Sequence, residues 1–97
     1  MSELDEILEN KVEELKKQRY EEFSGYVNRV FSLVEIIKGK KYYFEVQAFP
    51  VSNGLKVSVE CSIRKFFFTF CGKQKYFLVL KNGQVKDIDG HDFYESS

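Results

Sequence analysis

The chain carries, at residues 55–64, the stretch Leu55-Lys56-Val57-Ser58-Val59-Glu60-Cys61-Ser62-Ile63-Arg64. Apolar and polar side chains alternate throughout this stretch, which is the pattern of a β-strand with one buried and one solvent-facing side. Such a strand needs neighbouring strands beside it and a second layer over its apolar side. The stretch therefore predicts an α+β fold, in which helical structure covers one face of an antiparallel sheet.

A second strand is predicted immediately before this stretch. Residues 42–49 show the same two-residue period. Pro50 cannot donate a hydrogen bond to a neighbouring strand, and Ser52-Asn53-Gly54 has the composition of a turn. We therefore expect the chain to reverse between the two strands and to pair them as a hairpin.

The connection after residue 64 leaves two alternatives. The apolar residues change phase at Arg64-Lys65, because Phe66, Phe68 and Phe70 would otherwise lie on the polar side of the strand. A tight hairpin at 64–65 restores the phase and pairs Cys61 with Phe68, whereas a bulge would restore it within one bent strand. We favour the hairpin.

Two further turns complete the predicted sheet. Gly72-Lys73-Gln74 indicates a turn before a strand at 75–80, and Asn82-Gly83 is a strong turn dipeptide before a short strand at 84–88. Residues 42–88 are thus expected to form a meander of four or five antiparallel strands.

The N-terminal residues predict a helix at 3–23. Ser2 and Asp5 have the spacing of a capping box, and Ser24-Gly25 is suited to end a helix. Apolar residues recur at steps of three or four between these ends, namely Leu4, Ile7, Leu8, Val12, Leu15 and Phe23. One side of this helix should therefore pack on the sheet.

Residues 26–37 are ambiguous between helix and strand. Their β-branched content favours a strand, but the polar residues recur at helical spacing. The apolar set Val27, Val30, Phe31, Val34 and Ile37 matches the template of an amphipathic helix. We therefore favour a second helix, or a kinked continuation of the first.

Charge is balanced overall but not along the chain. Fifteen Lys and Arg residues match fifteen Asp and Glu residues, which gives no global field for nucleic acid or membrane. Residues 1–25 nevertheless carry a net charge of −4, and residues 38–75 carry +6. We expect this complementarity to be used either within one molecule or between copies of it.

The length and composition favour one domain over residues 1–97, with a helical part at 1–37, the sheet at 42–88 and a polar tail at 89–97. No apolar run is long enough to span a membrane, and the first residues are acidic where a secretory signal would be basic. Cys61 and Cys71 lack C-x-x-C spacing, which fits a reducing compartment. A cytoplasmic location without a membrane partner is expected.

Catalytic and metal-binding patterns are weak. The chain has one histidine, His91, in the expected tail, so a Cys–His pair would depend on an unpredicted contact. The acidic segment 87–92 resembles a calcium loop only in part, because Val85 and Ser96 occupy positions that need carboxylates. We expect no enzymatic activity, no metal site and no cofactor.

The sequence instead favours a protein-interaction module, one that self-associates as a homo-oligomer or binds another protein. Aromatic residues on the outer face of the sheet would form an apolar patch unless something covers them. Single-stranded nucleic-acid binding by the basic, aromatic strands at 56–77 is the alternative. A small ligand-binding or enzymatic pocket between helix and sheet is a third possibility. The candidate interaction face comprises Tyr43, Phe49, Lys56, Arg64, Lys65, Phe67, Lys73, Lys75 and Tyr76.

Overall fold

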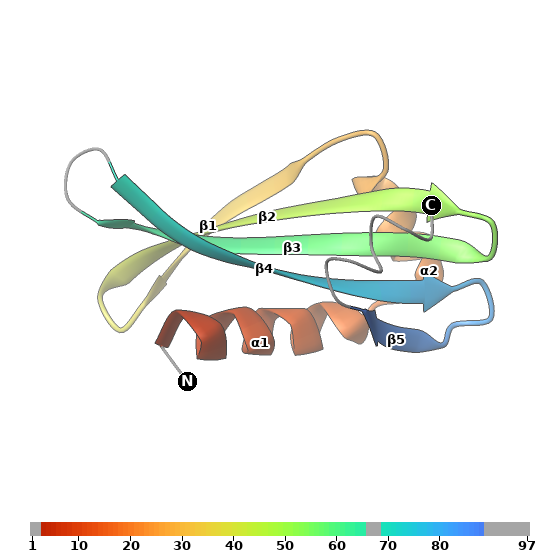
Figure 1. The fold of residues 1–97 in the computed structure, drawn as a ribbon, viewed down its shortest axis with the longest axis horizontal. Coiled ribbons are helices and arrows are strands. Elements are labelled where there is room, and N and C mark those ends of the chain that lie inside the picture. The colour runs from red at the N-terminus through yellow and green to blue at the C-terminus, as the bar shows by residue number, and fades with distance from the viewer. Residues whose placement is uncertain (1–2, 66–68, 89–97) are drawn as a thin grey trace.

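The computed structural model describes residues 3–65 and 69–88 of the chain, which form an N-terminal helix packed on a five-stranded antiparallel sheet (Figure 1). The predicted α+β class is thus confirmed. The helices are α1 (Glu3–Lys16), the short α2 (Tyr20–Phe23) and a single 3₁₀ turn, η1 (Ser24–Tyr26). The strands are β1 (Phe31–Ile37), β2 (Lys40–Val51), β3 (Gly54–Lys65), β4 (Thr69–Leu80) and β5 (Val85–Ile88).

The sheet is a meander in the order β1-β2-β3-β4-β5, so each strand pairs with its neighbour in the sequence. The predicted strand at 55–64 lies at its centre, within β3. Lys38 and Gly39 have positive φ angles of 53° and 80°, as a two-residue type I′ hairpin between β1 and β2 requires. The predicted turn at Asn82-Gly83 is also present, with Gly83 at φ 93°.

The core lies between α1 and one face of the sheet. Alternation in β3 turns Leu55, Val57, Val59 and Cys61 toward the helix, and each of them is buried. In Figure 1, α1 lies along this face, where it packs mainly on β3 and β4. All the apolar residues predicted for the buried side of the helix are indeed buried.

The predicted single helix at 3–23 is interrupted. α1 ends at Lys16, and bonds from the amides of Lys17 and Gln18 to carbonyls three residues earlier tighten its last turn. The chain resumes as α2 in a new direction, which places Phe23 in the core against Phe77, with ring centres 5.8 Å apart. The helix does not continue on the sheet because residues 16–19 are all polar and provide no apolar side chain to pack there. Ser2 lies outside the described residues.

The favoured second helix at 26–37 is wrong, because residues 31–37 form strand β1. Asn28, with a φ of 64°, redirects the chain before the strand begins. β1 then pairs with β2 from Phe31↔Val46 to Ile37↔Lys40. The β-branched residues were the better guide, because pairing with a neighbouring strand overrides a weak helical pattern.

The favoured hairpin at Arg64-Lys65 is also wrong. β3 continues through both residues, and Lys65 pairs with Thr69, so the chain reverses between these two. Cys61 consequently pairs with Lys73 instead of Phe68, and Cys71 pairs with Ile63. Residues 66–68 and 89–97, which include Phe66, Phe68, His91 and the expected tail, lie outside the described residues.

The predicted turn at Gly72-Lys73-Gln74 is wrong as well, because β4 runs through it without interruption. Gly72 lies opposite Ser62, and a Cβ at this glycine would come within 3.1 Å of the Ser62 Cβ. Glycine therefore serves close approach of two strands here, and not chain reversal.

Candidate functional site

Five of the predicted interaction residues share the outer face of the sheet, away from α1. The alternation and register of β2, β3 and β4 place there Tyr43, Phe49, Lys56, Arg64 and Tyr76. This face is less open than predicted, because Ser58 is buried, Glu60 is half-buried and Lys56 is only 2% exposed. Lys56 therefore does not lie at a solvent-exposed rim.

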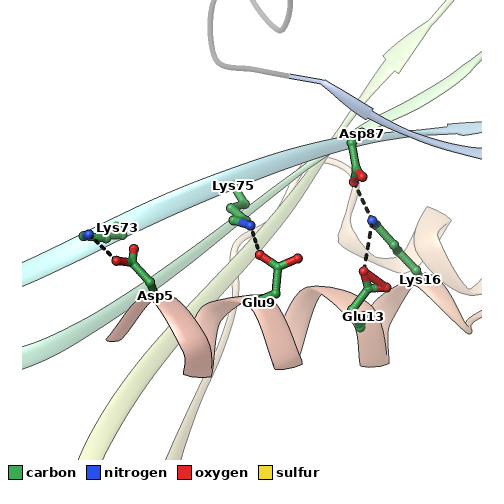
Figure 2. A network of polar contacts seen from close by, with 7 residues as sticks. All are labelled: Asp5, Glu9, Glu13, Lys16, Lys73, Lys75 and Asp87. Atoms are coloured by element: carbon green, nitrogen blue, oxygen red, sulfur yellow. Dashed lines mark hydrogen bonds and ion pairs between the residues drawn. The ribbon is translucent and has the colours of Figure 1, made fainter. Parts of the chain in front are cut away.

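Two of the predicted lysines lie on the opposite, helix-facing side. Lys73 and Lys75 pair in β4 with Cys61 and Val59, and both reach toward α1 (Figure 2). The Lys73 ammonium lies 2.7 Å from a carboxylate oxygen of Asp5, and Lys75 forms an ion pair with Glu9. The opposite charges of helix and sheet are thus matched within one molecule. Lys65 contributes its backbone to β3, and Phe67 lies outside the described residues.

The ion pairs continue along the helix toward β5. Lys16 lies between two carboxylates, Glu13 on its own helix and Asp87 on β5 (Figure 2). Burial opposes the charge of Lys16, but the hydrogen bond and the charge of Asp87 outweigh this effect, so the pKa of Lys16 is raised. Together with the pairs of Lys73 and Lys75, this contact joins one side of α1 to β4 and β5.

The other side of α1 is joined to β1 and β2. The Tyr42 hydroxyl donates a 2.9 Å hydrogen bond to Glu3, and this bond, with the charge of Lys40, lowers the pKa of the Glu3 carboxyl. Lys11 is 8% exposed, lies 4.9 Å from the ring centre of Phe44 and forms an ion pair with Glu35 on β1. The only charged residue of β1 is therefore already engaged by the helix.

The thiol of Cys61 is buried in the core. Burial, followed by the charge of Glu35, raises the pKa of the Cys61 thiol to about 11, so it is protonated near neutral pH. No group of three or more His, Cys, Asp or Glu side chains within residues 3–65 and 69–88 is placed to hold a metal ion.

A depression of about 380 Å³ lies where the third possibility placed a pocket, beside α1 and between it and β4–β5. Its charged lining includes Glu9, Lys75 and Asp87. Glu9 is paired with Lys75, and Asp87 with Lys16, so these charges bind one another. The charged groups that line the depression therefore already have partners within the molecule.

The surface that sequence reasoning missed is β1. Outside residues 65–71, the exposed large apolar residues of the described chain are Val30, Phe31, Val34 and Ile36, together with Phe49 on the neighbouring strand. Val34 and Ile36 are 52% and 72% exposed and lie on the outer face, where Val34 pairs with Tyr43. The two-residue spacing of Val34 and Ile36 was the available signal, but the apolar residues Leu33 and Ile37 on the other face of the strand obscured it.

The cluster extends past the start of β1. Val30 and Phe49 line a common depression of about 230 Å³ on the β1–β2 side of the molecule. We call Val30, Phe31, Val34, Ile36 and Phe49 the β1 surface. Phe31 lies on the helix-facing side of β1, whereas Val34 and Ile36 lie on its outer face, so these side chains flank one edge of the sheet. A concentration of exposed apolar side chains is a usual mark of an interaction site.

No helix in the described part of the chain has the length and apolar character needed to cross a membrane. Comparisons with protein-family models, with curated proteins and with solved structures gave no significant match.

Proposed function

We propose that this protein is a non-enzymatic protein-interaction module that self-associates through the β1 surface. The observation that carries the proposal is the concentration of its exposed large apolar side chains on β1 and the adjacent end of β2. Burying such side chains against a partner removes apolar area from water, which is the main favourable term in protein association. The proposed surface keeps Phe49 of the predicted face but is centred one strand further out.

A second copy is the proposed partner, because the β1 surface carries little charge for selecting a different one. Glu35, the one charged residue of β1, is bound by Lys11 of the same molecule, and the exposed charges on the neighbouring part of β2, Lys41 and Glu45, are opposite in sign. Homodimer interfaces are typically more apolar than those between transient partners. In an isologous contact, both copies use the same surface, so a single apolar patch on each copy is sufficient to form the dimer.

Nucleic-acid binding receives less support from the geometry. Two of the lysines on which it depended, Lys73 and Lys75, face the helix and are paired with its carboxylates. A phosphate would have to displace these carboxylates. Cys61 is a free, buried thiol, which agrees with a cytoplasmic location, and we include that location in the proposal.

Light scattering tests the proposal. We expect the wild-type protein to be dimeric at micromolar concentration and Ile36→Asp to be monomeric, because a charge at this position would be desolvated in the interface. Ile36 is 72% exposed within one molecule, so the substitution should leave the thermal unfolding of the monomer nearly unchanged. Gln84→Asp, at an exposed position beside β5, is the matched control and should remain dimeric. A wild-type protein that is monomeric at high concentration overturns the proposal.

A further inference from the structure

The strand β1 has an open edge as well as an apolar surface. Among residues 3–65 and 69–88, β1 is hydrogen-bonded to β2 and to no other strand. Alternate backbone N–H and C=O groups of an edge strand point away from its sheet and can pair with another strand. β1 therefore offers hydrogen-bonding groups beside its exposed side chains.

β1 lacks the usual protection against such pairing. Its register with β2 runs through all seven residues without a bulge, it contains no proline, and its single charge is held by Lys11. The opposite edge is different. β5 has only four residues, and two of them, Lys86 and Asp87, are charged and exposed. The part of β4 that extends beyond its pairing with β5, residues 69–75, carries Lys73 and Lys75, which are paired with α1. One edge of the sheet is suited to pairing and the other is not.

We propose that two copies join edge to edge through β1, in antiparallel orientation and centred on Val34, to form one continuous ten-stranded sheet. This inference rests on the proposed function and specifies how the self-association occurs. Each copy has one such edge. The pairing uses the β1 edge of each copy, so no β1 edge remains open and the assembly closes as a dimer. Growth into a filament would need a second unprotected edge.

The centre of the register follows from side-chain matching. A two-fold axis through Val34 pairs all seven residues, with Phe31 opposite the partner's Ile37 and Leu33 opposite the partner's Glu35. Moving the centre to Glu35 would place two like charges opposite each other, which is unfavourable. Moving it to Leu33 would pair Ile36 and Ile37 with residues that precede the strand. Val34 is the centre that avoids both defects.

The helix leaves room for this arrangement. α1 packs mainly on β3 and β4, away from the β1 edge (Figure 1). The helix-facing side of β1 is consequently only partly covered, with Phe31 43% exposed and Leu33 and Ile37 half-buried. Pairing of two β1 strands would bring apolar side chains together on both faces of the joined sheet.

Disulfide cross-linking between engineered cysteines tests the register. In a Cys71→Ser background, which leaves only the buried Cys61, Val34→Cys should give a covalent dimer under mild oxidation. Directly opposite residues of an antiparallel pair have Cα separations compatible with a disulfide. Ser32→Cys and Ile36→Cys should each stay uncross-linked alone, because identical residues would lie about 13 Å apart along the strand. Mixed together, these two variants should cross-link to each other.

The outcomes separate the two proposals. A protein that is dimeric by light scattering but gives no Val34→Cys cross-link, while Phe49→Cys cross-links instead, overturns edge pairing and keeps self-association. A monomeric wild-type protein overturns the proposed function itself. Cross-linking of the Cys71→Ser background alone would show that Cys61 is accessible and would contradict its burial in the structure.

Discussion

Lys11 shows how a single charged residue can belong to the core of this fold. Its aliphatic stem is buried beneath the sheet, its ammonium lies over the Phe44 ring, and it binds Glu35 on β1 and Glu14 on its own helix. Burial disfavours its charge, but the hydrogen bond and charge of Glu35 outweigh this penalty and raise its pKa. The contact therefore joins the first helix to the edge strand.

Lys11→Ala should lower the free energy of unfolding by about 1.5–3 kcal/mol, because it leaves the half-buried Glu35 without its charged partner. Urea denaturation measures this loss. The double variant Lys11→Met/Glu35→Gln, which keeps the packing but removes both charges, should recover most of the stability. Equal losses in both variants would contradict a role for the ion pair.

The pH dependence of this contact follows from the raised pKa of Lys11. A lysine whose pKa is higher in the folded state contributes stability that is fully present below its unfolded pKa. That contribution is lost as the pH rises through the folded pKa. The difference between wild type and Lys11→Met should accordingly shrink as the pH rises through the alkaline range.

At the scale of elements, the sheet depends on close approach between β3 and β4. Gly54 opens β3 opposite Leu80, and a Cβ at this glycine would lie 2.1 Å from the backbone oxygen of Val79. A backbone atom in a paired strand cannot move aside as a flexible side chain can. The turn chemistry of Asn53-Gly54 thus coincides with a steric requirement that comes from a distant strand.

Gly54→Ala should therefore destabilise the protein by about 1–3 kcal/mol, the usual cost of forcing extra atoms into a packed site. Gly25→Ala is the matched control, because no atom lies within 4 Å of its added Cβ. The control should be neutral or slightly stabilising, since alanine restricts the unfolded chain more than glycine does. Thermal unfolding of both variants gives the comparison, and equal unfolding temperatures would contradict the steric argument.

At the scale of the whole molecule, opposite charges on the helix and the sheet align the two layers. Asp5 and Glu9 lie one helical turn apart and meet Lys73 and Lys75, which lie two residues apart on β4 (Figure 2). Each exposed pair stabilises the fold by only about 0.2–1 kcal/mol. Their combined effect lies in selecting one orientation of the helix over others.

Reversing both charges on the sheet tests this role. Lys73→Glu/Lys75→Glu should lower the free energy of unfolding by about 1–3 kcal/mol, as two attractions become repulsions. Adding Asp5→Lys/Glu9→Lys should restore part of the loss, whereas Lys81→Glu/Lys86→Glu, at exposed positions elsewhere, should have a smaller effect. High salt should reduce the difference, since exposed charges are screened. A loss that salt and the compensating pair leave unchanged would contradict the charge argument.

Local sequence determined the features that depend on near neighbours. The alternation at 55–64 predicts the central strand, the apolar spacing from Leu4 to Leu15 predicts the first helix, and Asn82-Gly83 predicts its turn. In each helix or strand one side is buried, so the period of its apolar residues indicates the backbone conformation directly. The α+β class follows from these elements alone.

Only the tertiary structure decided the state of residues 31–37, the register of β3 with β4 and the side of the sheet on which Lys73 and Lys75 lie. An edge strand such as β1 has partly exposed residues on both sides, so its apolar pattern carries no single period. Strand register is set by pairing between residues far apart in the sequence, and a shift of one residue exchanges the two faces. The β1 surface arises from both effects, because the edge position leaves Val34 and Ile36 exposed and the register with β2 places them on one face.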